Sequence, residues 1–236
     1  MADLEDAVAP AEKAAARDVV AAVRPRVVRV NGADTPFFAD DLAAIGELEL
    51  DAIVLPKATP EAVAALGATG PPVIAIVETA WGLRAAYETA AAARVAALVL
   101  GAVDLGAEVG LQPRPDGLEI LYARSKVVFD SAAAGIRPPF DIVHLDIRDE
   151  QGLEAECSLA RSLGLRGKAC IHPAQVPVVN RVFTPAAEEI AWARRVIEAY
   201  EQAEREGRGV LALDGVMVDL PVVTRARRVL ATAEGR

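Results

Sequence analysis

The sequence has few of the residues on which several classes of protein depend. Only two of its 236 residues are cysteines and only two are histidines. Two cysteines behind an acidic N-terminus argue against the disulfide framework of a small secreted domain, and they lack the spacing of zinc ligands. We therefore interpret Cys157 and Cys170 as small core residues. With His144 and His172 as the only histidines, a Ser-His-Asp hydrolase is disfavoured as well.

Positive charge is also scarce. The 25 lysines and arginines face 34 aspartates and glutamates, which gives a formal charge of −9 at pH 7. A nucleic-acid-binding protein usually carries a basic stripe, and this sequence has none. The longest apolar runs, such as residues 95–102, are far too short to cross a bilayer. The sequence therefore predicts a cytoplasmic protein that binds neither nucleic acid nor a membrane.

What the sequence does contain is a repeated alternation of short apolar runs and longer alanine-rich segments. The short runs are nearly continuous in apolar residues, which is typical of parallel strands covered on both faces. Strands are predicted at residues 26–31, 52–57, 73–78, 96–100, 141–146 and 168–172. Helices are predicted at residues 10–23, 36–48, 60–66, 81–92, 117–134 and 150–163.

Repeated βα units form either a closed barrel or an open doubly wound sheet. Polar or charged residues end nearly every predicted strand: Asn31, Lys57, Glu78, Asp104, Asp146 and His172. A barrel collects all these ends on one face, whereas an open sheet needs such ends only at its switch point. We therefore predict an α/β fold of the TIM-type (β/α)8 barrel class.

The predicted barrel covers residues 1–183, and a C-terminal helical arm or lid follows over residues 184–236. Only a strand fragment precedes residue 7, so fewer strands are predicted than a closed eight-stranded barrel needs. We therefore expect a barrel that lacks its first strand and helix. Because such a gap exposes strand edges and core side chains, we expect this chain to express poorly or to fold only as an oligomer.

Two carboxylates in this pattern suit a metal site. Glu78 and Asp104 follow successive predicted strands, so they would lie close together, where like charges repel unless a proton or a cation lies between them. Magnesium takes one or two carboxylates, and water and substrate oxygens complete its coordination. From spacing alone, caps on the helices that follow are an equally good interpretation.

Two cations lie in or beside the same strands. Arg29 lies within an apolar run, so its guanidinium must reach solvent or meet an anion. It could bind a substrate carboxylate or an enolate oxygen, and an ion pair with a core carboxylate is an equal alternative. Lys57 could likewise bind substrate or neutralise nearby carboxylates. No glycine-rich dinucleotide or phosphate loop follows a predicted strand.

Seven short segments carry a resemblance to a known family. They are residues 3–8 (DLEDAV), 28–31 (VRVN), 55–57 (LPK), 76–79 (IVET), 101–105 (GAVDL), 167–173 (GKACIHP, with Gln175) and 215–219 (GVMVD, with Pro221). In this order they resemble the HpcH/HpaI aldolase/citrate lyase family, in the branch of citrate lyase beta subunits and related CoA-ester lyases. Each segment is weak alone, but together they cover nearly the whole chain.

The resemblance implies a role for each matching residue. Glu78 and Asp104 would be the protein ligands of Mg²⁺, and Arg29 would bind the carbonyl or enolate oxygen of the substrate. Glu5 and Asp6 would lie nearby and hold metal-bound water.

The resemblance also implies the reaction and its alternatives. The substrate would be a malyl-, citramalyl- or citryl-type CoA ester, cleaved to a keto acid and an acyl thioester. Asp219 would be the acid/base at the acyl α-carbon, in the active site of a neighbouring subunit of a homo-oligomer such as a trimer. The alternatives are a citrate lyase beta subunit acting on a citryl-acyl-carrier protein, and an inactive truncated paralogue or scaffold.

Overall fold

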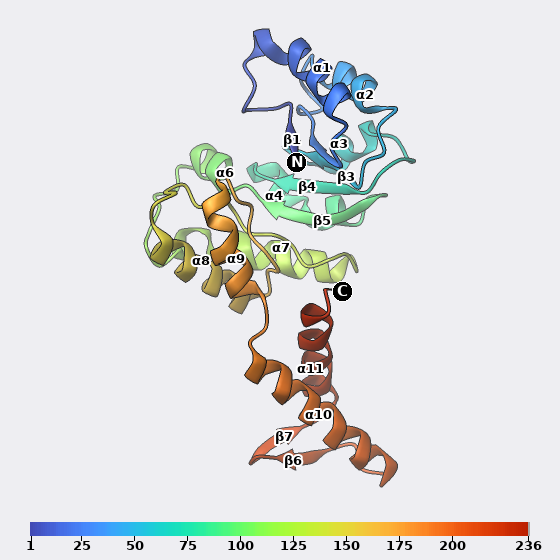
Figure 1. Ribbon diagram of the computed structural model, residues 1–236, viewed down its shortest axis with the longest axis vertical. Helices are drawn as coiled ribbons and strands as arrows, with labels where there is room; N and C mark the ends of the chain where they lie inside the picture. Colours follow the sequence, from blue (N-terminus) through green and yellow to red (C-terminus); the bar gives the residue numbers. More distant parts are fainter. Residues whose placement is uncertain (236) are drawn as a thin grey trace. The chain divides into compact units, whose positions relative to one another are not determined.

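The computed structural model describes residues 1–235 (Figure 1). Its contacts divide the chain into two compact units, Met1–Val179 and a second unit that begins at Asn180. The division falls inside helix α9 (Val176–Phe183). Each unit is described by itself.

Five parallel strands run through the first unit in chain order. They are β1 (Ala2–Asp3), β2 (Val27–Arg29), β3 (Ala52–Leu55), β4 (Val73–Val77) and β5 (Val95–Leu100). Their order across the sheet is β1-β2-β3-β4-β5, and every pairing is parallel. A doubly wound sheet reverses its order at a switch point, whereas sequential parallel neighbours are the arrangement of barrel strands. The predicted α/β fold is therefore confirmed in its sheet order.

Two parallel bridges extend this order beyond β5. Val99 pairs with Phe140, and Asp141 pairs with Lys168. The predicted strands 141–146 and 168–172 are thus reduced to isolated bridges. After the first of them the chain turns, and the Asp146 carboxylate accepts a hydrogen bond from the Arg148 N–H. Within residues 1–235 the parallel order therefore consists of five strands and two bridged segments.

The helices of the first unit lie in the connections between the strands. They are α1 (Lys13–Val23), α2 (Phe38–Ile45), α3 (Pro60–Ala65), α4 (Ala80–Arg84), α5 (Ala86–Ala90), α6 (Ala102–Val109), α7 (Leu121–Ala133) and α8 (Glu150–Leu163). Short 3₁₀ turns at Pro10–Glu12, Leu118–Ile120 and Pro173–Gln175 precede α1, α7 and α9. The predicted helix 81–92 is instead two helices, because Ala85 leaves helical geometry.

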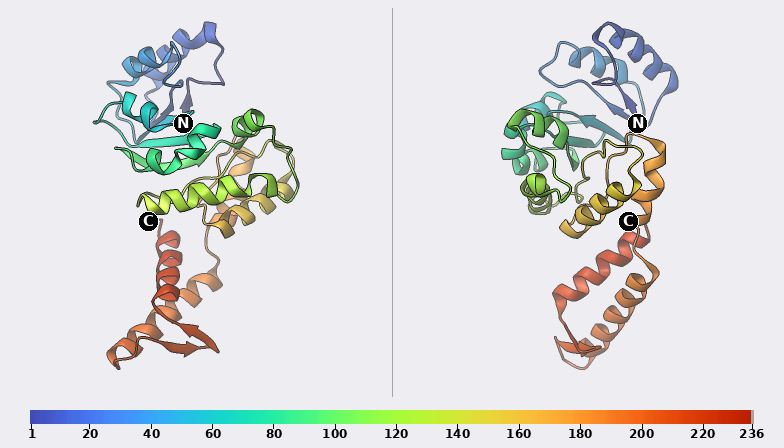
Figure 2. Two further views of the ribbon diagram at one scale, coloured as in Figure 1. Left: turned by 180° about the vertical axis from the view of Figure 1, so that it is seen from behind. Right: turned by 90° about the vertical axis from the view of Figure 1, so that its left-hand side faces the viewer.

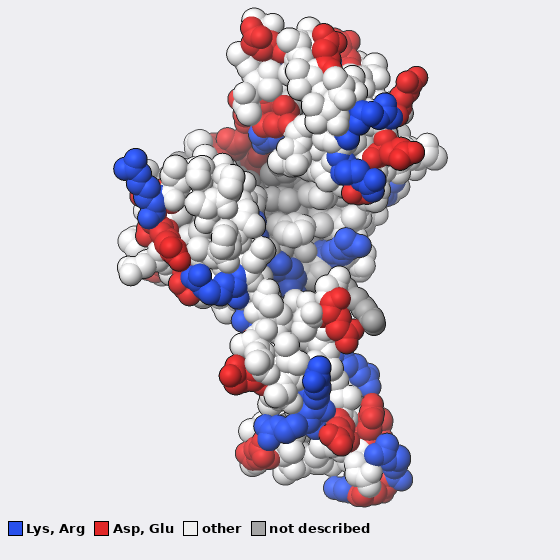
Figure 3. Space-filling model, in the orientation of Figure 1, with Lys and Arg blue, Asp and Glu red and all other residues white. Residues whose placement is uncertain are grey.

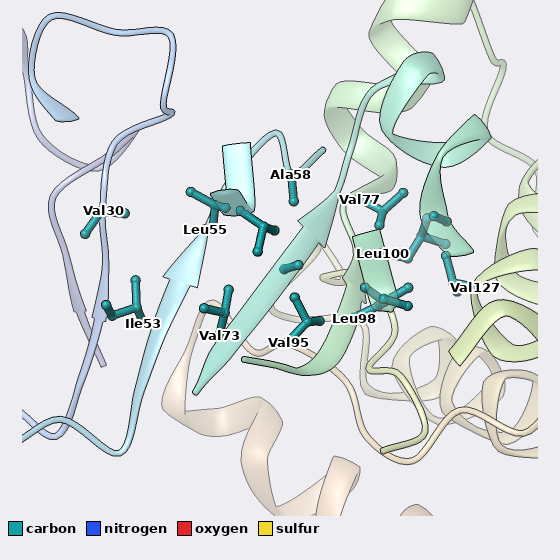
Figure 4. Close-up of a cluster of buried hydrophobic side chains, with 14 of the residues drawn as sticks. Val30, Ile53, Leu55, Ala58, Val73, Val77, Val95, Leu98, Leu100 and Val127 are labelled. Carbon is teal, nitrogen blue, oxygen red and sulfur yellow. The ribbon is translucent and has the colours of Figure 1, made fainter. Parts of the chain in front are cut away.

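The core of this unit is built on the apolar side chains of successive strands. Figure 4 shows them in rows from β2 to β5 and on to α7. Val28, Leu55, Val77, Leu98 and Val127 are fully buried. All four residues of β3 are buried, as expected for a strand covered on both faces. Burial of each such side chain contributes roughly 1.5–3 kcal/mol, which fixes the strand ends that carry the polar residues.

The second unit is a helix pair with a hairpin. Helices α10 (Ala187–Arg205) and α11 (Leu220–Ala233) lie side by side (Figure 2), and the antiparallel strands β6 (Leu211–Leu213) and β7 (Val216–Val218) connect them. The hairpin turn, Asp214 and Gly215, has positive φ at both residues, which is the pattern of a tight two-residue hairpin. Val196, Tyr200, Val218 and Val223 belong to a separate apolar core in this unit.

The surface carries charges of both signs, and the helices are polar enough to be compared with the requirements of a membrane span. On the face shown in Figure 3, acidic and basic side chains are interspersed over both units. Among residues 1–235, no helix combines the length and the apolar character that a membrane span requires.

Candidate active site

The polar residues that follow β1 to β4 meet at the carboxyl ends of these strands. Arg29 is the last residue of β2, Lys57 lies two residues after β3, and Glu78 directly follows β4. Glu5 lies two residues after β1. Because the carboxyl ends of parallel strands share one edge, the fold collects these side chains in one ionic cluster.

Arg29 is held by two carboxylates. The strand register pairs it with Asp3, whose two oxygens accept hydrogen bonds from its Nε, at 2.8 Å, and its Nη2. Its Nη1 lies 2.8 Å from Glu5 Oε2. The hydrogen bond to Asp3 raises the pKa of Arg29. Burial acts to raise the pKa of Asp3, but the bonds to Arg29 and the Glu5 N–H hold it below its usual value. The ion pair that was one of the two alternatives for Arg29 is therefore present. Binding of substrate by Arg29 stays a prediction.

Glu5 connects Arg29 with Lys57. Its carboxylate is buried, and its Oε1 accepts a hydrogen bond of 3.0 Å from the Lys57 ammonium. Its Oε2 contacts Arg29, but the contact is not aligned as a hydrogen bond, and no other described residue donates to this oxygen. One buried carboxylate oxygen therefore retains the capacity to accept a further donor, such as a water molecule.

Lys57 occupies a strained position. Its φ is +47°, in the left-handed region that non-glycine residues seldom adopt, and such strain clusters at functional sites. Burial acts to lower the pKa of Lys57, but its hydrogen bond to Glu5 and the charges of Glu5 and Glu78 raise it. The side chain is 41% exposed, so its ammonium is accessible from solvent.

Glu78 is the most perturbed acid of the cluster. It is 5% exposed, and its Oε1 accepts a hydrogen bond of 2.8 Å from the Lys57 N–H. Burial raises the pKa of Glu78 to about 7; the Lys57 N–H opposes this shift, and the negative charges of Glu5 and Asp104 add to it. Near neutral pH this carboxyl group therefore still holds a proton much of the time. A bound cation could replace that proton.

Gly101 makes room for the Glu78 side chain. A Cβ atom at residue 101 would lie 2.5 Å from Glu78 Cβ and 2.7 Å from Glu78 Oε2. Atoms of a normal side chain do not approach so closely, so only glycine fits beside this carboxylate. The sequence predicted no role for this glycine, although it belongs to the GAVDL segment that carries part of the family resemblance.

Asp104 lies near Glu78 but not at a strand end. β5 ends at Leu100, and Asp104 lies in the first turn of α6, which corrects the predicted strand-end position. Neither carboxylate is itself a helix cap, so the capping interpretation is wrong for Asp104 and holds beside Glu78 only through the next residue, Thr79. Gly101 is the N-cap of α6, with no side-chain cap, and the Thr79 hydroxyl caps α4 by accepting from the Gly82 N–H at 2.9 Å.

The donor set suits magnesium better than zinc. Within residues 1–235, no three or more His, Cys, Asp or Glu side chains gather as a metal site. Magnesium needs only one or two carboxylates, since water and substrate oxygens complete its octahedron. The pair Glu78 and Asp104, whose charges interact, meets that smaller requirement.

Two further acids were predicted to act here. Asp6 is exposed, and its charge contributes to the raised pKa of both Arg29 and Lys57, so it lies near the cluster. Asp219 belongs to the second unit. It is the N-cap of α11, where its Oδ1 accepts from the Val222 N–H at 3.3 Å. Its role in catalysis stays a prediction.

Asp3 is a member of the cluster for which the sequence predicted no role, although it belongs to the DLEDAV segment. The signal was its register, because parallel pairing of residues 2–3 with β2 places Asp3 directly beside Arg29. A cation in one strand and an acid at the matching position of its neighbour predict such a pair.

Comparison with known proteins identifies the family of this chain. Residues 1–173 match the profile of the HpcH/HpaI aldolase/citrate lyase family. The chain belongs to this family. The predicted family is thereby confirmed, as is the predicted enzyme class, a carbon–carbon lyase of the citrate lyase beta type.

Relatives at about 40% identity extend over nearly the whole chain. A (3S)-malyl-CoA thioesterase of Cereibacter sphaeroides is 43% identical over 98% of this chain and 85% of its own length. Citrate lyase subunit beta of Leuconostoc mesenteroides is 39% identical over 99% of this chain and 84% of its own length. The crystal structure of protein CitE from Mycobacterium tuberculosis in complex with magnesium, acetoacetate and coenzyme A superposes with a TM-score of 0.85. It is 40% identical and covers 98% of this chain and 88% of that one.

Proposed function

We propose that this family member is a magnesium-dependent lyase acting on a 3-hydroxy-3-carboxyl acyl-CoA of the malyl, citramalyl or citryl type. The products would be a keto acid and an acyl thioester. The observation that carries the proposal is Glu78, a buried carboxyl group at a strand end whose pKa is about 7 and which has a second acid, Asp104, nearby. The similarity to a malyl-CoA enzyme, and to CitE in complex with magnesium and coenzyme A, supports the substrate class.

Glu78 and Asp104 would hold the magnesium ion. Their carboxylate oxygens are the ligands this ion prefers, and their mutual repulsion is relieved by a cation. When bound, the ion would supply electrophilic stabilisation of negative charge on the substrate oxygens. Glu5, with its unsatisfied Oε2, and the neighbouring Asp6 would orient water molecules beside it.

The two cations of the cluster would bind and polarise the substrate. The Lys57 ammonium would pair with the substrate carboxylate, and Arg29 would donate to the thioester carbonyl oxygen. Loss of the hydroxyl proton to water lets that oxygen form the carbonyl group of the keto acid as the carbon–carbon bond breaks. The bonding pair becomes the thioester enolate, which Arg29 stabilises. Asp219 would then transfer a proton to the enolate carbon.

The test is a product assay with defined thioesters. Purified protein with Mg²⁺ is incubated with malyl-, citramalyl- and citryl-CoA, and glyoxylate, pyruvate and oxaloacetate are measured. We expect one keto acid in an amount equal to the acyl-CoA formed, with no turnover when EDTA replaces Mg²⁺. Folded protein that releases no keto acid from any of these thioesters, or that is indifferent to EDTA, would contradict the proposal.

A second candidate is hydrolysis of malyl-CoA. It is favoured by the relatives named (3S)-malyl-CoA thioesterase, which are 41–43% identical to this chain. The same assay separates the two, since hydrolysis gives malate and free CoA whereas cleavage gives glyoxylate and acetyl-CoA. The similarity to citrate lyase subunit beta adds a citryl-acyl-carrier protein as a further substrate to test. A folded protein without turnover on any of them would favour a scaffold.

Asp219 would act in a neighbouring copy of a homo-oligomer. The test is a mixture of Glu78→Gln and Asp219→Asn proteins, each of which should be nearly inactive alone. If the two residues serve one site from different chains, mixed oligomers regain activity at sites that combine both intact residues. If oligomers shown to have exchanged subunits do not regain activity, then either both residues serve the site from one chain or Asp219 has no role in catalysis.

A further inference from the structure

We propose that Lys13 is a positioning residue for the cluster, whose buried ammonium holds the main chain of Leu4 and Glu5. Its effect on turnover rests on the proposed function, but its effect on the loop that follows β1, residues 4–9, does not. Lys13 is the first residue of α1 and is 6% exposed. Its Nζ donates to the Leu4 carbonyl oxygen at 2.6 Å and to the Glu5 carbonyl oxygen at 2.7 Å.

The partners of this ammonium are unusual for a buried charge. Besides the two carbonyl groups it has the ring of Phe37, whose centroid is 5.4 Å away. Among residues 1–235 it has no carboxylate partner. Burial of an ammonium without a counter-ion is costly, and the positive N-terminus of α1 adds to that cost. A lysine here is therefore poorly explained by core packing and well explained by the two carbonyl groups it holds.

A second set of contacts holds the same loop from β2. Asn31 Nδ2 donates to the Leu4 carbonyl oxygen at 2.8 Å and to Asp41 Oδ2 at 2.6 Å. Asp41 is fully buried, and its Oδ1 accepts from Arg17 Nε at 2.8 Å. The Leu4 carbonyl group is thus fixed by two side chains. The Glu5 carbonyl group is fixed by Lys13 and by the Val8 N–H at 3.0 Å.

This arrangement controls where the Glu5 carboxylate lies. With its backbone fixed, Glu5 contacts Arg29 at 2.8 Å and Lys57 at 3.0 Å. A loop that is free to move by an ångström would separate these charges and lose the alignment. Misplacement of that size costs up to about a hundredfold in rate. Lys13 therefore acts on the chemistry through Glu5 and does not contact the reacting atoms.

The chain offers a matched control for this role. Arg94 also holds loop carbonyl groups, those of Leu66, Gly67 and Pro71, at 2.8–3.0 Å. These groups lie before β4, at the amino end of the strands and away from the cluster. Substitution of Arg94 removes the same kind of contact, so it reports the structural effect alone.

The experiment compares Lys13→Met with Arg94→Met in the full chain. For Lys13→Met we expect kcat to fall by about tenfold to a hundredfold while KM changes less than about threefold. Amide hydrogen exchange of residues 4–9 should accelerate by about tenfold or more. Arg94→Met should keep the wild-type kcat and the wild-type exchange of residues 4–9. Lys13→Arg, which can donate to both carbonyl groups, should restore part of the loss.

Each result decides the proposal. Wild-type exchange of residues 4–9 in Lys13→Met overturns it, and so does an equal loss of kcat in Arg94→Met. If Lys13→Met does not fold, Lys13→Gln is measured by the same criteria, since its shorter amide cannot hold both carbonyl groups. If the wild-type protein has no turnover, the proposed function fails, while the exchange measurement still tests Lys13.

Discussion

Two of the ionic clusters in the first unit differ in balance and in exposure. In one, Arg124 donates to both oxygens of Asp141 at 2.9 and 3.1 Å, and Lys168 contacts Asp141 at 3.0 Å and Glu156 at 2.7 Å. Two cations meet two carboxylates there, and Arg124, Asp141 and Lys168 are almost fully buried. This closed cluster joins α7 and α8 to the paired segments that follow β5.

The cluster at the ends of β1 to β4 is neither balanced nor closed. Arg29 and Lys57 interact with four carboxylates, those of Asp3, Glu5, Asp6 and Glu78, and the charge of a fifth, Asp104, acts on Glu78. The two cationic side chains are 21% and 41% exposed. A structural cluster pairs every charge because unpaired buried charge is costly. A surplus of acid in the open cluster is therefore what we expect if this cluster takes up a cation, as proposed above.

The largest effect should come from breaking the closed cluster. Asp141→Asn would leave Arg124 and Lys168 buried without their shared counter-ion, which should lower the free energy of unfolding by about 3–5 kcal/mol. Urea denaturation measures this change. Equal stability of the variant would mean that these charges are not paired as described.

Glu78→Gln should have the opposite effect to Asp141→Asn, because it should lower activity and leave the stability of the fold intact. We expect kcat to fall by about 10²–10³ because Gln lacks the charge with which Glu78 is proposed to hold the ion. Stability without Mg²⁺ should be kept or increased, because Gln carries no charge that burial penalises. The assay is turnover beside urea denaturation. If Glu78→Gln has normal turnover, or is as unstable as Asp141→Asn, then the open cluster does not differ from the closed one in serving activity and not stability.

The raised pKa of Glu78 should appear in the pH dependence of stability. The folded state binds this proton up to about pH 7, whereas the ordinary value is 4.5, so the stabilising contribution is complete below pH 4.5 and is lost as the pH rises through 7. Without Mg²⁺ the loss is at most about 3 kcal/mol. Denaturation at pH 5 and pH 8 should show this slope in the wild type and a smaller one in Glu78→Gln. Identical slopes would contradict the assignment.

The smallest effect should come from a surface ion pair near the same strands. Arg26 donates to both oxygens of Asp51, and both side chains are exposed. Pairs of this kind are screened by solvent and contribute little. Asp51→Asn should therefore change neither the urea midpoint nor kcat measurably, which makes it the control for the other variants. A clear loss of either would indicate an unrecognised role of this edge.

The sequence predicted the strand order and the positions of most charged residues of the cluster, because strand ends follow from apolar patterning. It could not predict the partner of Arg29, which depends on the register between β1 and β2. It also could not predict the burial of Lys13, because a lysine at the start of an alanine-rich helix fits a solvated face equally well. The segments after β5 were predicted as strands from their apolar patterning, but they form only single bridges, because patterning does not fix how far a pair of strands stays hydrogen-bonded.

Gly101 gives the site an unusual vulnerability. Its missing side chain leaves the space that the Glu78 carboxylate occupies. Replacement by alanine adds only one methyl group and alters no charge, yet that methyl group would clash with the Glu78 side chain and displace its carboxylate. A lineage could therefore lose the chemistry by a change at a residue that bears no functional group, while every acid and base of the cluster remained in its sequence.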